Sequence, residues 1–144
     1  MRLVIDTNVL VSHLFWPYSR IGMLVDGLLE YEDVLRSAET FSELTDVVMR
    51  RKFDRYLSIA QREVFLGEFY DTSEHVLITE RIDACRDAKD NKFLELAVCG
   101  KAEFILSGDE DLLALNPFKG IRIADPAAFF RDAERAVKLQ LGLE

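Results

Sequence analysis

Several acidic side chains lie where a predicted strand ends or a predicted helix begins. Asp6 interrupts the apolar run in "VIDTNVLVS", and Asp109 follows an apolar run in "ILSGDEDLL". Glu43 and Asp90 occupy early positions of two predicted helices. Carboxylates gathered in one pocket repel each other, so at least one holds a proton unless a cation is present. Because Mg²⁺ and Mn²⁺ prefer carboxylate and water oxygens, these acids suit metal-assisted hydrolysis of a phosphodiester bond.

Each of these acids also has a purely structural interpretation. Asp6 can cap the turn that follows a strand. Asp90 and Asp109 are both competent helix N-caps. Glu43, expected in the first turn of its helix, favours a helix N-terminus electrostatically. The functional interpretation therefore requires that all four acids lie close together in the fold. Whether they do depends on the strands and helices that carry them.

Apolar runs alternate with segments whose apolar residues recur at helical spacing. Short continuous apolar runs are typical of parallel strands buried on both faces. Strands are predicted at residues 2–5, 33–37, 75–78, 102–107 and 121–124. Helices are predicted at 21–29, from a cap at Thr40 or Ser42 to about Arg51, from Ser58 to about Tyr70, at 90–100, in "GDEDLLAL", and from Pro126 onward. This order predicts an α/β fold, with a parallel sheet of about five strands and helices on both faces.

The predicted sheet brings the acids to one edge. In an open parallel sheet, ligands bind beyond the carboxyl ends of the strands, near the point where strand order reverses. If strands 2–5 and 102–107 are neighbours, their ends lie ~4.8 Å apart. Asp6 and Asp109 would then converge, with Asp90 and Glu43 close enough to join them.

Composition limits the class of protein. The chain has 144 residues, 49% of them hydrophobic and 31% charged, which fits one globular domain over residues 1–144. A net charge of −8 argues against a broad basic surface that coats nucleic acid, but not against a local site. No apolar run approaches the ~20 residues of a membrane span. Asp6 and Asn8 interrupt the N-terminal apolar run, so we do not expect it to act as a signal peptide. Two cysteines form no disulfide framework, and we expect a cytoplasmic protein.

Four motifs together resemble a known family. "VIDTNVLVS", "FSELTDVV", "CRDAKDNKFLELA" and "ILSGDEDLL", in this order and spacing, are similar to the PIN domain, and especially to bacterial PIN proteins related to VapC toxins. The likeness runs from Arg2 to about Phe130. It implies a Rossmann-like sheet, a ribonuclease that depends on Mg²⁺ or Mn²⁺, and the toxin role in a toxin–antitoxin pair.

The resemblance also implies roles for individual residues. The family's catalytic acids match Asp6, Glu43, Asp90 and Asp109, and its metal ligands match Asp6, Asp90, Asp109 and Asp111. Asn8, Ser107 and Asp87 fit supporting positions. Ala97, seven residues after Asp90, fits the family's helix pattern. The implied partners are an RNA substrate, an antitoxin protein and further copies of the chain, as a homodimer or higher oligomer, with no membrane.

Residues outside the acid set receive weaker interpretations. Thr7 and Asn8 are expected to shape a turn behind Asp6, and Glu95 is expected on a helix surface. The segment "HLFWPY" is expected to be an aromatic loop, which either stacks a base or packs against a neighbouring helix or subunit. In the basic run "RRKFDR", the candidate RNA contacts are Arg50, Arg51 and Lys52, although the run itself favours a solvated helix end over RNA contact.

Two alternative functions are compatible with the resemblance, and two other classes of protein are not compatible with the sequence. A PIN module can bind RNA or protein without catalysis, or act as a nuclease in RNA processing. A phosphatase of the haloacid dehalogenase type needs a second acid two residues after the first, where this chain has Asn8. A phospho-receiver domain needs an aspartate after its third strand and a lysine near its fifth, and neither is present at those positions.

Overall fold

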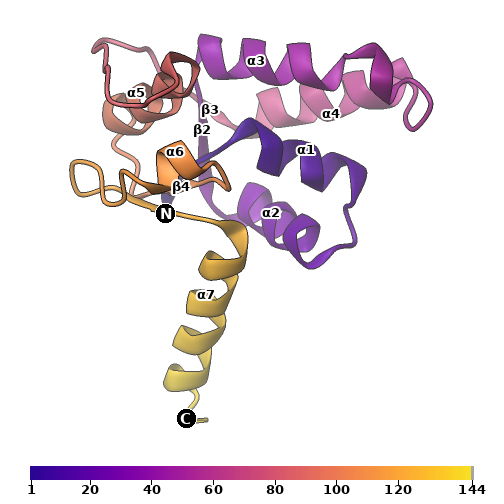
Figure 1. Ribbon diagram of the computed structural model, residues 1–144. Coiled ribbons are helices and arrows are strands. Elements are labelled where there is room, and N and C mark those ends of the chain that lie inside the picture. The colour runs from indigo at the N-terminus through magenta and orange to yellow at the C-terminus, as the bar shows by residue number, and fades with distance from the viewer. Residues whose placement is uncertain (144) are drawn as a thin grey trace.

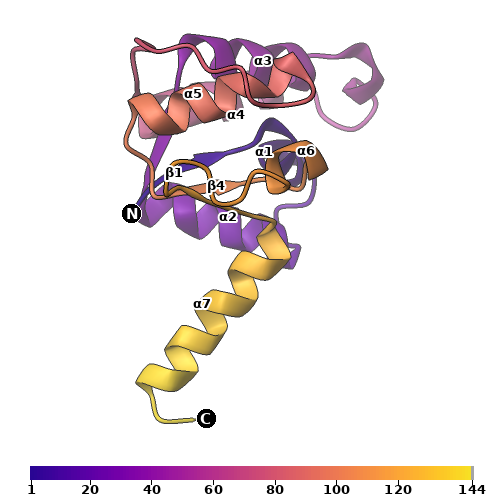
Figure 2. The same cartoon turned by 60° about the vertical axis from the view of Figure 1, so that its left-hand side comes forward.

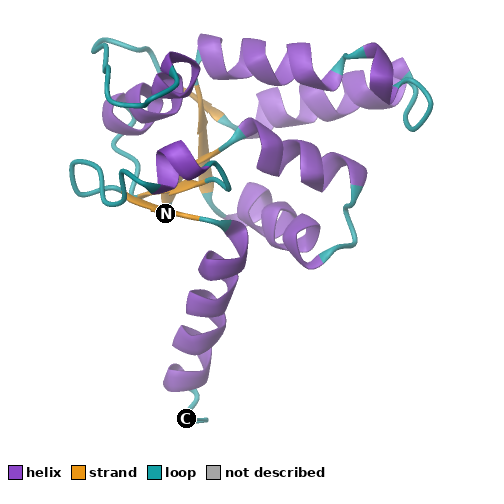
Figure 3. Ribbon diagram, in the orientation of Figure 1, coloured by secondary structure: helices purple, strands orange, loops and turns teal. Residues whose placement is uncertain are grey.

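A five-stranded parallel sheet forms the centre of the protein. The computed structural model describes residues 1–143, and Figures 1 and 3 show its helices around the sheet. The strands follow the spatial order β3-β2-β1-β4-β5. Their bounds are Arg2–Ile5 (β1), Asp33–Arg36 (β2), Glu74–His75 (β3), Phe104–Leu106 (β4) and Arg122–Ala124 (β5). Strand order reverses between β1 and β4, which pair with Ile5 opposite Leu106.

Alternate residues of the central strands enter two separate cores. Leu3 and Ile5 of β1 belong to one apolar cluster, whereas Val4 between them belongs to the other. Phe104 and Ile105 divide in the same way in β4. Because successive side chains point to opposite faces of a sheet, this division shows that both faces are buried. The prediction of helices on both faces is therefore confirmed.

The helices divide between the two cores. Buried residues of α1 (Thr7–Phe15), α2 (Arg20–Tyr31), α3 (Ala38–Val48) and α4 (Ile59–Thr72) belong to the first core. Those of α5 (Asn91–Cys99) and α6 (Glu110–Leu113) belong to the second. Two short 3₁₀ helices, η1 (Arg51–Phe53) and η2 (Ala88–Asp90), lie in the connections before α4 and α5.

The C-terminal helix α7 (Pro126–Gln140) projects away from the rest of the protein, as both views show (Figures 1 and 2). Only Pro126 is buried in this helix. Its N-cap is Asp125, whose side chain accepts a hydrogen bond from the Ala128 N–H at 2.8 Å. Among residues 1–143, no helix has the length and apolar character needed to cross a membrane.

Three local predictions were wrong. The expected turn at Thr7 and Asn8 is the start of helix α1, because Val9 and Leu10 pack into the first core. The helix after β2 begins earlier than expected, at a capping box in which the Ser37 hydroxyl accepts from the Thr40 N–H. The third strand covers only two residues rather than 75–78, since β3 is the outer strand and pairs with β2 alone.

Candidate functional site

Asp6 and Asp109 meet at the carboxyl ends of β1 and β4, where strand order reverses. The Ser107 hydroxyl donates a hydrogen bond of 2.6 Å to Asp6 Oδ2 and accepts one of 3.0 Å from the Asp109 N–H. The Asp6 N–H donates to the Leu106 carbonyl at 2.9 Å. Ser107 therefore links the two acidic segments, although it lies 101 residues from Asp6 in the chain.

Asp6 is a buried acid. It is only 6% exposed, and Ser107 is fully buried beside it. Burial raises the pKa of the Asp6 carboxyl, the Ser107 hydrogen bond opposes this shift, and the nearby charges of Glu43 and Asp109 raise it further. An ionised Asp6 is therefore costly unless a cation lies beside it.

Three further carboxylates gather next to it. Oxygen atoms of Asp90, Asp109 and Asp111 all lie within 4.8 Å of one another. Asp109 also caps α6, because its Oδ1 accepts from the Asp111 N–H at 2.8 Å. Asp111 forms an ion pair of 3.3 Å with Arg86, whose side chain is largely exposed. The structural and functional interpretations of Asp109 are therefore both compatible with its position.

Asp90 does not act as a helix cap. Its side chain forms no capping hydrogen bond to α5, whereas Asp87, three residues earlier, caps η2 by accepting from the Lys89 N–H. Burial raises the pKa of Asp90 to about 6, and the charges of Asp109 and Asp87 add to this effect. Asp90 occupies the N-cap position of α5, as predicted, but its side chain makes no capping hydrogen bond, so its carboxylate is available for another role.

Glu43 lies at the edge of this cluster, outside the 4.8 Å group. It is the sixth residue of α3, so the expected place in the first turn was wrong. Glu43 Oε1 accepts a hydrogen bond of 2.9 Å from Lys92 Nζ, and Oε2 accepts one from the Thr7 hydroxyl. Both oxygens are therefore engaged, and Glu43 holds Lys92 beside the acids.

The donor set fits a hard divalent cation. Mg²⁺ binds oxygens at 2.0–2.1 Å, so two of its ligands lie at most ~4.2 Å apart. Small side-chain movements bring the oxygens of Asp90, Asp109 and Asp111 from within 4.8 Å to that separation. All are carboxylates, and the neighbouring thiol, Cys85, is a poor ligand because burial raises its pKa to about 11.

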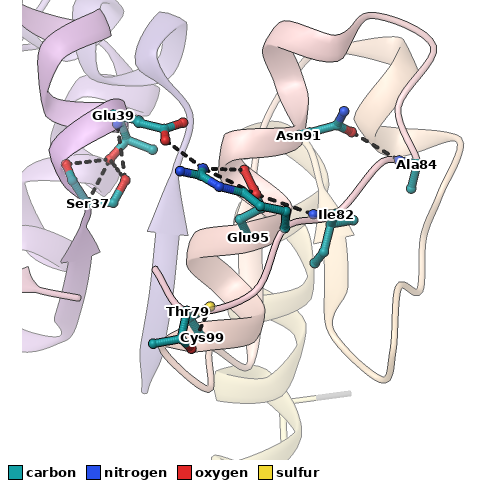
Figure 4. A network of polar contacts seen from close by, with 10 residues as sticks. Ser37, Glu39, Thr79, Ile82, Ala84, Asn91, Glu95 and Cys99 are labelled. Atoms are coloured by element: carbon teal, nitrogen blue, oxygen red, sulfur yellow. Dashed lines mark hydrogen bonds and ion pairs between the residues drawn. The ribbon is translucent and has the colours of Figure 1, made fainter. Parts of the chain in front are cut away.

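A hydrogen-bond network fixes the irregular segment 76–90 that leads to Asp90 (Figure 4). Asn91 Oδ1 accepts from the N–H groups of Ala84 and Cys85 at 3.2 and 2.8 Å. Glu95 Oε2 accepts from the Ile82 N–H, and Arg81 lies between Glu95 and Glu39. This segment is therefore attached to α5 directly and to α3 through Arg81.

The protein matches the family model described as "PIN domain" over residues 2–111. The chain belongs to the PIN domain family. A relative of this PIN domain is the uncharacterized protein MJ1680 of Methanocaldococcus jannaschii, which is 32% identical over 118 residues, or 81% of this chain and 76% of the relative. The resemblance predicted from the four motifs is thus confirmed.

Two solved structures show the same fold. The protein PAE2754 from Pyrobaculum aerophilum has a TM-score of 0.63 at 14% identity, covering 93% of this chain and 90% of its own. VapBC2 from Rickettsia felis, bound to a DNA fragment from its promoter, has a TM-score of 0.60 at 13% identity, covering 87% of this chain and 98% of its own. The predicted Rossmann-like parallel sheet is therefore the fold of this PIN domain.

Some residues of the site in this PIN domain were not predicted. Thr7 was assigned to a turn but contacts Glu43 from the first residue of α1. Glu95 was expected on a helix surface but is only 5% exposed, because the segment carrying Arg81 and Ile82 covers it. The one sequence signal for the burial of Glu95 was its position among the apolar residues of "KFLELA".

The remaining predicted residues lie around the acids or away from them. Asn8 is exposed and borders the same hollow as Asp6 and Asp109. Its backbone, rather than its side chain, holds Asp6: a hydrogen bond from the Asn8 backbone to the Asp6 carboxyl opposes the rise in the pKa of Asp6. Arg50, Arg51 and Lys52 follow the C-terminal end of α3 and do not join the acid cluster.

Proposed function

We propose that this PIN domain, as a single domain over residues 1–144, is an endoribonuclease that uses Mg²⁺ or Mn²⁺. The observation that carries the proposal is the group of Asp90, Asp109 and Asp111 oxygens within 4.8 Å, next to buried Asp6. The family supports a divalent metal and a nuclease. The intact acid set favours catalysis over a binding module without activity.

The chain's own residues have distinct tasks in this proposal. Asp6, Asp90, Asp109 and Asp111 would hold the metal, which supplies an activated water and stabilises charge on the phosphate. Ser107 orients Asp6 and fixes the backbone of Asp109. Lys92, which pairs with Glu43, and Arg86, which pairs with Asp111, would attract the RNA phosphate. Glu43 and Thr7 position Lys92.

The biological setting belongs to the same proposal. VapBC2 is a toxin–antitoxin complex, and its likeness in fold supports an antitoxin partner here. We include a homodimer or higher oligomer on the strength of the family resemblance. A cytoplasmic location fits an RNA substrate and the two free cysteines, Cys85 and Cys99.

Cleavage of RNA tests the proposal. Purified protein is incubated with a pool of single-stranded and structured RNAs in Mn²⁺ or in EDTA, and the products are sequenced. We expect cleavage in Mn²⁺ only, and its loss in Asp6→Asn and Asp109→Asn. Asp26→Asn, which changes an exposed carboxylate on α2, is the matched control and should cleave normally. Full activity in EDTA, or in both site variants, would refute the mechanism.

A further inference from the structure

Two surface connections meet beside the C-terminal end of α1. Residues 16–19 join α1 to α2, and residues 49–58 join α3 to α4 through η1. The ring centroids of Phe15 and Phe53 lie 4.6 Å apart, so the end of α1, directly before the first connection, contacts η1 in the second. Figure 1 shows both on its right-hand side. Their exposed side chains form what we call the aromatic–basic surface: Trp16, Tyr18, Arg51, Lys52, Arg55 and Tyr56.

The aromatic rings of this surface are open to solvent. Trp16 is 64% exposed, Tyr18 89% and Tyr56 66%. Exposed rings of this size are hydrophobic area that the fold has not buried, so they are accessible to a ligand. The Arg55 guanidinium lies over one face of Tyr56, 5.7 Å from the ring centroid, which places a positive charge beside that ring. Unpaired bases stack on such faces, and each base stacked in this way strengthens binding of a single strand.

The basic side chains of the surface are not neutralised. Within residues 1–143, Arg51, Lys52 and Arg55 form no ion pair with a carboxylate. The single acid among them, Asp54, accepts a charge-assisted hydrogen bond of 2.6 Å from Arg62. The segment therefore carries concentrated positive charge on a protein whose net charge is −8. Such a local excess fits the phosphates of a nucleic acid.

Both connections are held in place by buried contacts. Arg62 is fully buried and donates to the carbonyls of Val48 and Arg50 at 3.1 and 3.2 Å. At the other connection, the Ser19 hydroxyl donates to the Trp16 carbonyl at 2.7 Å. Gly22 permits this close packing, since a Cβ there would lie 2.2 Å from the Trp16 oxygen. The surface is thus organised before any ligand binds.

The surface lies within reach of the acid cluster. A hollow of about 490 Å³ runs along α3 and is bordered by Lys92 and Glu43 at one end and Arg50 at the other. Glu43 and Val48, the last residue of α3, are five residues apart, which is ~7.5 Å along the helix axis at 1.5 Å per residue, and Arg51 follows beyond the end of the helix. A stacked strand rises ~3.4 Å per nucleotide, so this part of the hollow spans at least two nucleotides. Of the three acids that border the hollow, Glu39 and Glu43 are paired with cations, and Asp46 is the third.

We infer that the aromatic–basic surface binds single-stranded RNA a few nucleotides away from the cleaved bond. This inference rests on the proposed function, because it treats the same strand as the substrate of the acid cluster. Duplex RNA keeps its bases stacked inside, so it cannot use the open rings of Trp16 and Tyr56. A single strand can place bases on the rings and phosphates on Arg51 and Lys52.

The only tryptophan of the chain, Trp16, reports on this binding directly. In EDTA, we expect an RNA of twelve uridines to quench the Trp16 emission, with an affinity that falls as salt rises. Arg51→Glu should weaken binding at least severalfold and reduce the salt slope by ~0.7 per lost phosphate contact. Tyr56→Ala should weaken it roughly 5- to 100-fold. The controls Arg131→Glu on α7 and Tyr31→Ala at the far end of α2 should bind like the wild type.

Three results would overturn the inference. One is RNA binding, seen by anisotropy of a labelled strand, that leaves the Trp16 emission unchanged. Another is equal weakening by Arg51→Glu and Arg131→Glu. The third is competition by a twelve-base-pair RNA duplex as strong as that by the single strand. The titration contains no metal, so it measures RNA binding separately from cleavage. If the RNA quenches the Trp16 emission but is not cleaved in Mn²⁺, only the proposed function is refuted. If the RNA is cleaved in Mn²⁺ but does not quench the emission, only the RNA-binding role of the surface is refuted.

Discussion

Replacing Asp90 with asparagine should stabilise the metal-free protein. Asp90 forms no capping hydrogen bond, so the change removes charge without removing a known contact. Burial and the charges of Asp109 and Asp87 raise the pKa of Asp90 from 3.8 to about 6. One pKa unit corresponds to ~1.4 kcal/mol, which gives ~3 kcal/mol as an upper limit. Solvent screening at this partly exposed side chain reduces the expected gain to about 1–2 kcal/mol.

The sign of the effect depends on pH. The pKa of Asp90 is raised in the folded protein, so the folded state binds the proton more tightly than the unfolded state does. The wild type therefore gains stability as pH falls from above 6 toward 3.8, whereas Asp90→Asn does not. The variant should melt higher by about 2–8 °C at pH 7.5 in EDTA, and this difference should vanish near pH 4.

Thermal unfolding curves in EDTA across this pH range give the measurement. Asp83→Asn, an exposed carboxylate in the same segment, is the control and should not change the melting temperature. Mn²⁺ at a hundred times Kd should stabilise the wild type by ~2.7 kcal/mol and the Asp90 variant far less. A variant that melts lower than the wild type in EDTA, or responds equally to Mn²⁺, would refute the reasoning.

Three further changes test the structure around the site. Ser107→Ala removes the hydrogen bond to buried Asp6 and should lower the free energy of unfolding, measured with urea, by about 1–3 kcal/mol. An unchanged urea midpoint would show that this hydrogen bond does not stabilise the fold. Arg62→Met should cost about 1–3 kcal/mol, because it leaves the buried Val48 carbonyl and two part-buried carbonyls without their donor. Arg62→Lys should not restore the loss. Gly22→Ala should destabilise the protein by at least ~1–3 kcal/mol, since its Cβ meets the Trp16 carbonyl. Normal melting of Gly22→Ala would show that the 16–19 connection moves freely.

The convergence of Asp6 and Asp109 could be predicted because alternating strands and helices leave few choices. Once β1 and β4 are parallel neighbours, the residues after Ile5 and Leu106 must share one edge of the sheet. The positions of the acids then follow from strand register alone. This reasoning needs no knowledge of side-chain contacts.

The burial of Glu95 could not be predicted in the same way. Its partners, Arg81 and Ile82, lie in an irregular segment whose path has no periodicity in the sequence. Helix α1 was missed for a related reason. Asp6 and Asn8 are common turn residues, and the packing of Leu10 against the first core decides between turn and helix.

The link between Asp6 and Ser107 also constrains when the site can form during protein synthesis. These residues are 101 positions apart, so the ribosome makes Asp6 about 5–20 s before Ser107 at ~5–20 residues per second. During that interval β1 has no β4 to pair with, and Asp90, Asp109 and Asp111 are not yet assembled around Asp6. The carboxylate cluster therefore cannot exist on a nascent chain shorter than about 111 residues, however early the first strands and helices fold.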